Sequence, residues 1–314
     1  MRSYDADVVI LALDRPAETE AAIASALAQR GVRRRVIVVD QGSRPTNLAR
    51  FARAVEHEDA ALISLGSNLG VPAGRNRGAA LGDARIVVGL DNDAVFDTPD
   101  TLARAVAALD ADPTLGAIGF RIVVAATGDD DLLSWGYPKA LLGRAGAVFD
   151  AATFVGAGHA IRRAAWEDAE GYDEALFFCW EELDFCLRAI GRGWRVRYHG
   201  DIVVRHKVSA ECRLDWSHGR WFHFVRNRLY IARKQGESWA ALLPRMAAYV
   251  LKGTRHGLGT QTLRAIGAAA CMSVDASPQS SVLRAYLDHH DRAHRGGVAA
   301  RLRTEVLARL PGSA

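Results

Sequence analysis

The chain has 314 residues, of which 49% are hydrophobic and 24% are charged, so it is long enough to bury one large core or two smaller ones. Its formal net charge of +4 reflects arginines dispersed among many acidic residues, and the first two hundred residues contain no continuous basic block. This distribution argues against nucleic acid as the main partner.

The sequence has no evident targeting or membrane-spanning segment. The apolar run at residues 8–13 is too short for the core of a signal peptide, and acidic residues precede it. No window approaches the roughly eighteen apolar residues that a spanning helix needs. The four cysteines, Cys179, Cys186, Cys212 and Cys271, include no C-x-x-C pair, which argues against a zinc site or a disulfide framework. We therefore expect a cytoplasmic protein.

Residues 6–120 alternate between short β-branched runs and helical stretches. Strands are predicted where apolar residues run together, and helices where they recur three and four positions apart. The expected strands are 7–13, 33–40, 61–66 and 84–91, and the expected helices are 15–31, 45–55, 72–82 and 98–112. This order is typical of β-α units around a parallel sheet.

The next segment, up to about residue 212, mixes strands with helices. It is expected to contain strands at 116–125, 158–163, 194–200 and 201–207, and helices at 163–169 and 180–193. From about residue 213 the pattern predicts only long helices. We therefore expect a first domain over residues 1–212, in two halves (1–98 and 99–212), and a helical region over residues 213–314.

Acidic residues collect where the predicted strands end. Asp14 follows the first strand, Asp40 ends the second, and Asp91 and Asp93 follow the fourth. The carboxyl ends of parallel strands line the ligand crevice of an open sheet, so these carboxylates are expected to converge. The D-x-D pair can bind a hard divalent cation together with substrate phosphates. The alternative is that acids follow strands simply because they form turns.

Four stretches of the sequence occur in a recognisable order. They are VVILALDRP, VIVVDQGSRP, NLGVPAGRNRGAALGDARIVVGLDND and FVGAGHAIRRAAWEDAEGYDEALFFCWEELDFCLRAIGRGWRVRYHGDIVVRHK. Together they resemble the family 2 glycosyltransferases of the GT-A fold, and the last resembles the rhamnosyltransferase-like branch. The resemblance covers about residues 6–235. It implies an α/β fold, with a mixed central sheet flanked by helices and a C-terminal helical extension, whose first half binds the nucleotide and whose second half binds the acceptor.

The resemblance also implies which residues bind the nucleotide. Asp40 is expected to bind the base, with Asp14, Asn68 and Arg75 nearby, and Asp91 is expected to contact the ribose. From the residues alone, Asp40 could instead open an Asx turn, and Arg75 could belong to the start of a helix.

A metal site is implied at the D-x-D pair. Asp93, with Asp91 and His206, is expected to bind Mn²⁺ or Mg²⁺ on the diphosphate of the donor. A divalent cation with a nearby arginine stabilises the negative charge that grows on the departing β-phosphate. Imidazole suits Mn²⁺ better than Mg²⁺. His206 is selected by the resemblance alone, because a lone histidine after a strand is usually a surface residue.

The second half is expected to supply the general base. The family usually shows Glu-Asp-x-Asp where this chain has Glu181, Glu182 and Asp184, so Glu182 stands in the position of the base. Glu181 and Asp184 are the alternatives, and acids in a first helical turn are also favoured by the helix dipole alone. Trp180 is expected to stack on a sugar ring or to belong to the core, and Gly158 to let the backbone approach a sugar.

Residues 218–236 interleave basic and aromatic side chains on a predicted helix. Such a helix can pack against the first domain or a second subunit, which is the interpretation we favour, or it can lie on an anionic membrane surface. A homodimer and a peripheral contact with the inner face of the membrane therefore both stay open.

The sequence thus predicts an inverting, metal-dependent glycosyltransferase. Its donor would be a UDP-, dTDP- or GDP-linked sugar and its acceptor a hydroxyl of a glycan, a lipid-linked glycan or a small molecule, in cell-surface polysaccharide or glycoconjugate synthesis. Inversion follows from the resemblance, because a single base and in-line attack require it. Two alternatives are a sugar-phosphate nucleotidyltransferase, although ALDRPAETE lacks the Gly-rich basic loop that it needs, and a non-catalytic nucleotide-sugar-binding or scaffold protein.

Overall fold

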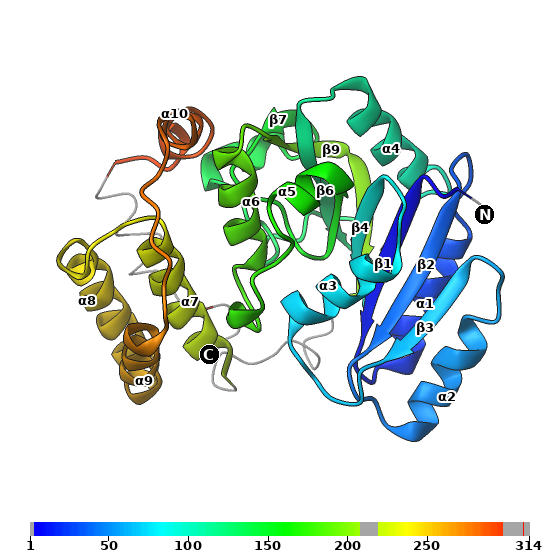
Figure 1. Ribbon diagram of the computed structural model, residues 1–314, viewed down its shortest axis with the longest axis horizontal. Helices are drawn as coiled ribbons and strands as arrows, with labels where there is room; N and C mark the ends of the chain where they lie inside the picture. Colours follow the sequence, from blue (N-terminus) through cyan, green and yellow to red (C-terminus); the bar gives the residue numbers. More distant parts are fainter. Residues whose placement is uncertain (1–2, 208–218, 298–309, 311–314) are drawn as a thin grey trace.

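The structure is a computed structural model that describes residues 3–207, 219–297 and 310. Within these residues the strands form one nine-stranded mixed sheet, ordered β3-β2-β1-β4-β8-β6-β9-β5, with β7 paired to β9 (Figure 1). The predicted α/β architecture, with helices flanking a mixed central sheet, is confirmed. The predicted boundary at residue 213 and Cys212 lie outside the described residues.

The N-terminal half is built from parallel β-α units, as predicted. Strands β1 (Ala6–Ala12), β2 (Arg34–Asp40), β3 (Ala60–Ser64) and β4 (Ile86–Asp91) are parallel, and helices α1 (Pro16–Leu27), α2 (Pro45–Ala54) and α3 (Val71–Leu81) connect them. Each of these helices has a proline in its first two positions, where the missing N–H costs no intrahelical hydrogen bond. The carboxyl ends of β1, β2 and β4 therefore share one edge of the sheet.

The second half continues the sheet with antiparallel and parallel strands. Its elements are β5 (Ala94–Phe96), α4 (Thr101–Ala111), β6 (Leu115–Val124), η1 (Lys139–Arg144), β7 (Val148–Asp150), β8 (Gly158–Arg162), α5 (Arg163–Asp168), η2 (Glu174–Leu176), α6 (Glu181–Gly191) and β9 (Arg195–His206). The short strands β5 and β7 were not predicted. The two strands expected at 194–200 and 201–207 are one strand, so that prediction is wrong. The register of β9 against β6 shifts between Phe120 and Arg121, which lets one strand pass through the polar Gly200–Asp201 step.

Alternate residues of the central strands face two separate cores. Val8 and Ile10 of β1 pack with α1, α2 and α4 on one side of the sheet, whereas Val9 packs with α3, α5 and α6 on the other. This period of two is the expected consequence of the pleat, and it makes a helix–sheet–helix sandwich. Both faces are covered, which is why the strands read as continuous apolar runs.

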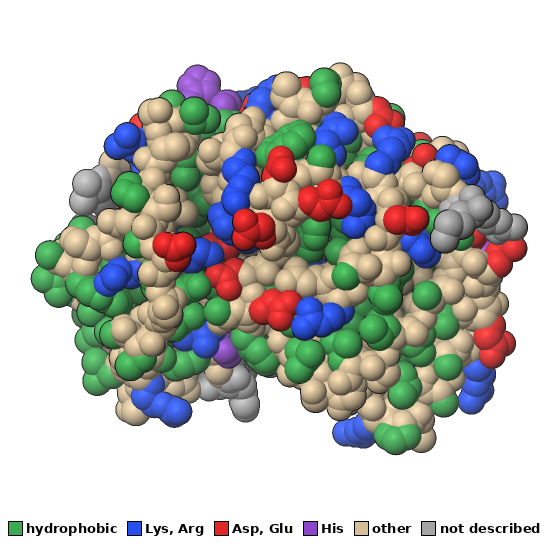
Figure 2. Space-filling view, viewed as in Figure 1, with side chains coloured by type: hydrophobic (Ala, Val, Ile, Leu, Met, Phe, Trp, Pro, Cys, Tyr) green, Lys and Arg blue, Asp and Glu red, His purple; other side chains and the backbone are tan. Residues whose placement is uncertain are grey.

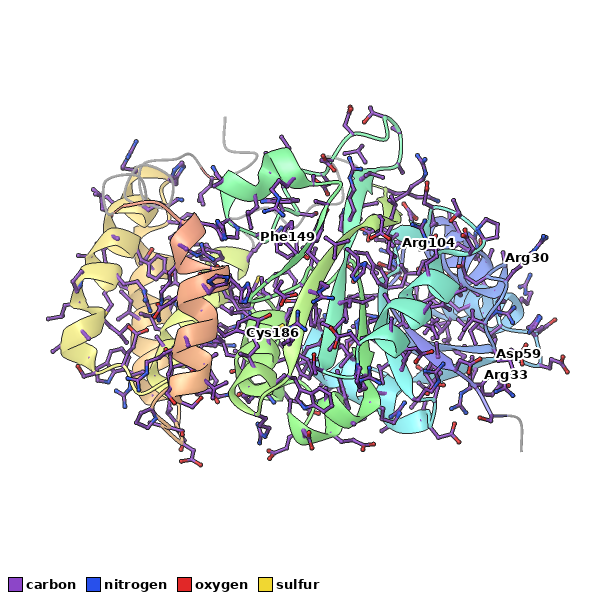
Figure 3. All side chains as sticks on the ribbon, turned by 90° about the horizontal axis from the view of Figure 1, so that it is seen from above. Arg30, Arg33, Asp59, Arg104, Phe149 and Cys186 are labelled. Atoms are coloured by element: carbon purple, nitrogen blue, oxygen red, sulfur yellow. The ribbon has the colours of Figure 1, made fainter. Side chains whose placement is uncertain are left out.

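The C-terminal helices form a third core and then return to the sheet. They are α7 (Trp221–Lys234), α8 (Trp239–Arg255), α9 (Gly259–Cys271), α10 (Ser281–His290) and η5 (Arg292–His294). Apolar residues of α7, α8 and α9 pack together, while Leu283 and Leu287 of α10 join the core beside α6. Cys186 of α6 lies between the sheet and these helices (Figure 3).

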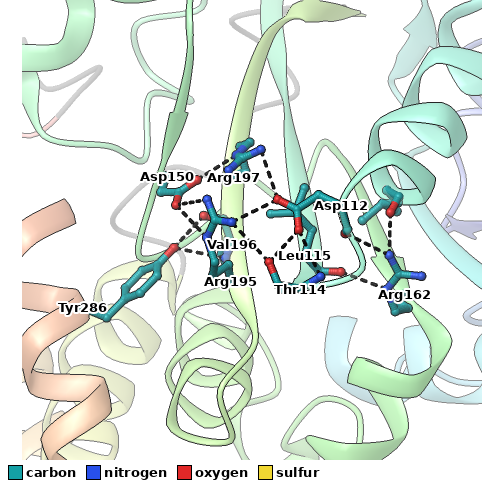
Figure 4. A network of polar contacts seen from close by, with 10 residues as sticks. Asp112, Thr114, Leu115, Asp150, Arg162, Arg195, Val196, Arg197 and Tyr286 are labelled. Carbon is teal, nitrogen blue, oxygen red and sulfur yellow. Dashed lines mark hydrogen bonds and ion pairs between the residues drawn. The ribbon is translucent and has the colours of Figure 1, made fainter.

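Helix α10 is tied to the sheet edge by polar contacts (Figure 4). The Tyr286 hydroxyl lies 2.8 Å from the carbonyl oxygen of Val196, to which it donates, and 3.1 Å from the Val196 backbone nitrogen, from which it accepts. Beside it, Asp150 accepts hydrogen bonds from Arg195 and Arg197 on β9. No helix among the described residues is long and apolar enough to cross a membrane.

Candidate active site at the carboxyl edge of the sheet

The loops after β1 and β2 are joined through Asp14. Its carboxylate accepts hydrogen bonds from the backbone N–H of Arg44 at 3.0 Å and from Asn47 Nδ2 at 2.8 Å, and its own N–H donates to Ser43 Oγ at 2.7 Å. The Arg44 N–H, followed by Asn47, lowers the pKa of Asp14. Asp14 thus stays ionised at the carboxyl edge of the sheet.

Asp40 and Asn68 are turn-forming residues in this structure. The fully buried carboxylate of Asp40 accepts from the N–H groups of Gly42 and Ser43 and from Ser64 Oγ at 2.8 Å. Asn68 Oδ1 accepts from the N–H of Gly70 at 2.9 Å. The Asx-turn alternative for Asp40 is therefore confirmed, and its role in binding a base stays a prediction.

Arg75 connects α3, β1 and β4 near the carboxyl edge of the sheet. It projects from α3, is 3% exposed, and donates to the carbonyl oxygens of Val9 in β1 and Leu90 in β4. Its Nη2 lies 2.8 Å from Asp91 Oδ1. Arg75 lies near the start of α3, as the alternative has it, and its side chain also holds the first residue of the D-x-D pair, while its role in binding a nucleotide stays a prediction.

The two aspartates of the D-x-D pair have different partners. Asp93 Oδ2 lies 2.8 Å from Arg15 Nη1, and its Oδ1 lies 3.3 Å from Nε2 of His206. Desolvation and the nearby charge of Asp93 raise the pKa of Asp91 against the effect of Arg75. Burial also acts to raise the pKa of Asp93, but His206 and then Arg15 outweigh it, so this pKa is lowered. Asp93 is therefore held as the ionised carboxylate.

His206 is oriented by a second carboxylate. Its Nδ1 lies 2.9 Å from Oδ2 of the buried Asp131, which leaves Nε2 facing Asp93. Burial disfavours the charged ring, but hydrogen bonds to Asp131 and Asp93 outweigh it and raise the pKa of His206 to about 10. A histidine that ligates a metal is commonly held in this way, with its other ring nitrogen bonded to a carboxylate.

The described residues supply two metal-binding side chains at this edge of the sheet and not a complete set of ligands. Among the residues that the structure describes, no three His, Cys, Asp or Glu side chains are grouped so that they could hold a metal ion. Asp93 and His206 are two adjacent side chains that can ligate a metal ion. Such a partial set fits a divalent cation that takes its remaining ligands from substrate phosphates, which is the usual arrangement for Mg²⁺.

Helix α6 begins with the acids expected to supply the general base. Burial raises the pKa of Glu182 to about 7, and burial with the adjacent charge of Glu182 raises the pKa of Glu181 well above its ordinary value. A side chain at Gly156 would collide with the carboxyl group of Glu182, and the next residue, Ala157, accepts a hydrogen bond from the N–H of Asp91, so this carboxyl lies near the D-x-D pair. A carboxyl group with a pKa near 7 is suited to accept a proton at neutral pH.

Asp184 faces away from these acids and serves another purpose. It is fully buried, with Oδ2 at 2.8 Å from Arg188 Nε and Oδ1 at 2.8 Å from Lys234 Nζ. Lys234 belongs to α7, so Asp184 ties α6 to the C-terminal helices. These contacts agree with the alternative in which Asp184 stabilises the fold and does not act as the base.

Two residues expected to contact a sugar are committed to packing. A side chain at Gly158 would meet Val204 and Phe120 of the core, whereas a side chain at Gly156 would collide with the carboxyl group of Glu182. Gly156 thus leaves room for the carboxyl group of Glu182, and the predicted approach of Gly158 to a sugar stays a prediction. The indole of Trp180 donates to the carbonyl oxygen of Phe224 at 3.1 Å and contacts its ring, so the core alternative fits Trp180.

Comparison with known proteins decides the family. The model of the family described as glycosyl transferase family 2 matches residues 7–168, which is just over half of the chain. The chain belongs to glycosyl transferase family 2. No curated protein gives a significant match to this glycosyltransferase.

Two solved structures share the fold of this glycosyltransferase. The mannosyltransferase PcManGT from Pyrobaculum calidifontis, solved with GDP-Man and Mn²⁺, has a TM-score of 0.60 and 22% identity over 98% of this chain and 84% of its own. GalNAc-T7, solved with UDP, GalNAc and Mn²⁺, has a TM-score of 0.61 and 15% identity over 97% of this chain and 58% of its own. The predicted GT-A fold is thereby confirmed, and the family supports a glycosyltransferase over a nucleotidyltransferase or a scaffold.

Two polar residues of this glycosyltransferase site were missed from the sequence. Arg15 follows Asp14 directly, so its position after the first strand could have predicted a positively charged side chain at this edge of the sheet. Asp131 lies in the GDDD run of a loop that carries no family pattern, and only its contact with His206 identifies it.

Proposed function

We propose that this glycosyltransferase moves a sugar from a nucleoside-diphosphate donor to a hydroxyl acceptor with inversion, in one metal-dependent displacement. The observation that carries the proposal is that Asp93, held between Arg15 and His206, and the carboxyl group of Glu182 come together at the carboxyl edge of the sheet. The pKa of Asp93 is lowered, whereas the pKa of Glu182 is raised to about 7. Environments that separate two carboxyl groups in this way suit one as an ionised ligand and the other as a proton acceptor.

The donor side of the proposal uses the carboxyl ends of β1, β2 and β4. Asp14, Asp40, Asn68, Arg75 and Asp91 would bind the nucleotide of a UDP-, dTDP- or GDP-linked sugar, with Arg75 acting through Asp91. Both similar structures were solved with a guanine or uracil nucleotide, which supports a nucleoside-diphosphate donor.

Asp93 and His206 would hold Mn²⁺ or Mg²⁺, with Asp91 close by. The ion would supply positive charge to the diphosphate as the sugar leaves. Arg15 lies 2.8 Å from Asp93 and adds a fixed positive charge at the same place. His206 would bind as the neutral ring, so it must give up the proton that its raised pKa retains in the free protein.

On the acceptor side, Glu182 would be the general base that takes the proton of the attacking hydroxyl. Residues 1–98 would form the nucleotide-binding half, residues 99–212 the acceptor-binding half, and residues 213–314 a helical region. Membership of the rhamnosyltransferase-like branch, and a place in cell-surface polysaccharide or glycoconjugate synthesis, remain part of this proposal.

A thermal-shift screen of nucleotide sugars with and without Mn²⁺ tests the donor class. A ligand that binds only the native state raises apparent stability by RT ln(1 + [L]/Kd), or about 2.7 kcal/mol at a hundredfold excess over Kd. We expect UDP-, dTDP- or GDP-linked sugars to raise Tm more with Mn²⁺ than without it. The free monosaccharides are the control, and a screen in which no nucleotide raises Tm would contradict the proposal.

For residues 218–236 the sequence favoured packing against the first domain or a second subunit over a membrane surface, and α7 does pack within the chain. Trp221, Val225 and Leu229 of this helix are fully buried within the chain. A contact with a membrane surface or a second subunit is better assigned to α8 and α9. Residues 238–274 contain four Lys or Arg and no acidic residue, and Leu243, Leu251 and Leu263 are more than half exposed. Figure 2 shows hydrophobic side chains gathered on the left of the molecule, over α8 and α9.

We propose that this face contacts an anionic lipid surface, because exposed leucines beside basic residues favour such a surface. Co-sedimentation with vesicles containing phosphatidylglycerol should exceed that with phosphatidylcholine alone, and added salt should weaken it. Leu243→Glu with Leu251→Glu should lower binding, whereas Leu81→Glu, an exposed position on α3, should not. Equal binding to both vesicles would remove the idea, and a concentration-dependent dimer lost in the double variant would favour the dimer instead.

A further inference from the structure

Residues 177–180, which lead into the acids of α6, have an unusual backbone. Phe177, Cys179 and Trp180 have φ angles of 61°, 72° and 74°, in the left-handed region that residues with a Cβ rarely adopt. None of them is a glycine. Such a conformation persists only when surrounding groups hold it in place. We call residues 177–180 the left-handed loop.

Helix α7 supplies most of the groups that hold this segment. The amide nitrogen of the fully buried Asn227 lies 2.9 Å from the carbonyl oxygen of Leu176, 2.8 Å from that of Phe178 and 2.9 Å from that of Cys179. Arg226 donates to the carbonyl oxygens of Ala175 and Leu176 and, through Nε, to Asn227 Oδ1. One buried amide therefore gathers the carbonyl groups on both sides of Phe177.

The carbonyl group of Phe177 reaches the nucleotide-binding half, whereas that of Trp180 accepts from the N–H of Asp184 within α6. The Phe177 carbonyl oxygen accepts from the N–H of Val71 at 2.8 Å, at the start of α3. A side chain at Gly70 would collide with the Phe177 backbone, so the two segments are in close contact. Helix α3 carries Arg75, which holds Asp91. The left-handed loop thus lies between the helix that orients Asp91 and the helix that presents Glu182.

We propose that Asn227 is a positioning residue for sugar transfer, which holds the left-handed loop so that Glu182, in the first turn of α6, is presented toward the D-x-D pair. The proposal depends on the proposed role of Glu182 as the general base. The hydrogen bonds of Asn227 are to Arg226 and to the backbone of residues 176–179, and not to the acids of α6. Asn227 acts through the backbone that leads into α6, and a displacement of that backbone moves the base away from the attacking hydroxyl.

The first test compares Asn227→Ala with Thr262→Val. Thr262 is a fully buried residue of α9 that accepts from Trp221 Nε1 at 2.8 Å, so its loss removes a buried hydrogen bond to α7 without touching the loop. Turnover is followed as GDP or UDP released from GDP-mannose or UDP-N-acetylgalactosamine with Mn²⁺. We expect Asn227→Ala to lower kcat on the order of 10²-fold at nearly constant donor KM, because small misplacements of a catalytic group are that costly. Thr262→Val should keep kcat.

Amide hydrogen exchange gives a second readout that needs no substrate. The amides of residues 177–182 should exchange faster in Asn227→Ala than in Thr262→Val, at matched global stability. If Asn227→Ala does not fold, Arg226→Met removes the guanidinium contacts with the carbonyl groups of Ala175 and Leu176, with Asn227 and with the Phe222 ring, and should give the same two effects, more weakly. Equal exchange in both variants, or a donor KM that changes while kcat does not, would overturn the positioning role.

The outcome for Glu182 separates this inference from the proposed function. If Glu182→Gln is inactive while Asn227→Ala keeps normal kcat, the positioning role is refuted and the base assignment stands. If Glu182→Gln keeps normal kcat, the base assignment itself is refuted.

Discussion

Replacing Glu182 with Gln is expected to lower kcat by roughly 10²- to 10⁴-fold, with little change in donor KM, because the amide cannot accept the proton of the attacking hydroxyl. In the native enzyme the base must be ionised, so kcat should fall as the pH drops below the raised pKa of about 7. A base with an ordinary glutamate pKa would keep its activity well below that pH. Steady-state kinetics of both proteins over pH 5 to 9 measure the effect.

Two neighbouring acids are the controls for Glu182. Glu181→Gln should keep most of kcat, because the raised pKa of Glu181 already favours its neutral form. Asp184→Asn should lower Tm, because it removes the buried carboxylate that pairs with Arg188 and Lys234, of which Lys234 keeps its contact with Asp173. Near-normal kcat in Glu182→Gln, together with a large loss in Glu181→Gln, would transfer the role of base to Glu181.

Replacing Asp93 with Ala is expected to abolish metal-dependent turnover while the fold stays intact. The variant removes the carboxylate that lies between Arg15 and His206, and with it the side chain best placed to bind a cation. We expect a loss on the order of 10²- to 10³-fold, as is typical when one stabiliser of the transition-state charge is removed. The measurement is nucleotide release as a function of Mn²⁺ concentration, with circular dichroism and Tm as tests of folding.

Asp97→Ala provides a matched comparison for Asp93→Ala. Asp97 is also ion-paired to β9, through Arg205, but successive residues of a strand point to opposite faces, so this pair lies away from His206. The Asp97→Ala variant should lose a surface ion pair and keep its response to Mn²⁺. Unchanged turnover and an unchanged Mn²⁺ response in Asp93→Ala would refute the metal role.

Helix α7 shows where sequence patterns stop being informative. Its alternation of basic and aromatic residues is compatible with a membrane surface, a dimer contact and packing within the chain. The structure decides for packing, since Trp221 and Val225 are buried and Asn227 holds the segment that leads into α6. A periodicity of residue types identifies which face of a helix is apolar, but it does not identify what covers that face.

Sequence patterns were sufficient to predict the parallel β-α half, the family resemblance and the gathering of Asp14, Asp91 and Asp93 at one edge of the sheet. Local patterning and the shared direction of parallel strands are sufficient for these conclusions. The partners of the acids were decided only by the tertiary structure. Arg15 meets Asp93 across 78 positions and His206 meets Asp131 across 75, and no local pattern records contacts between segments so far apart. The left-handed loop was likewise hidden, because its φ angles are imposed by α7, a helix about 50 residues further along the chain.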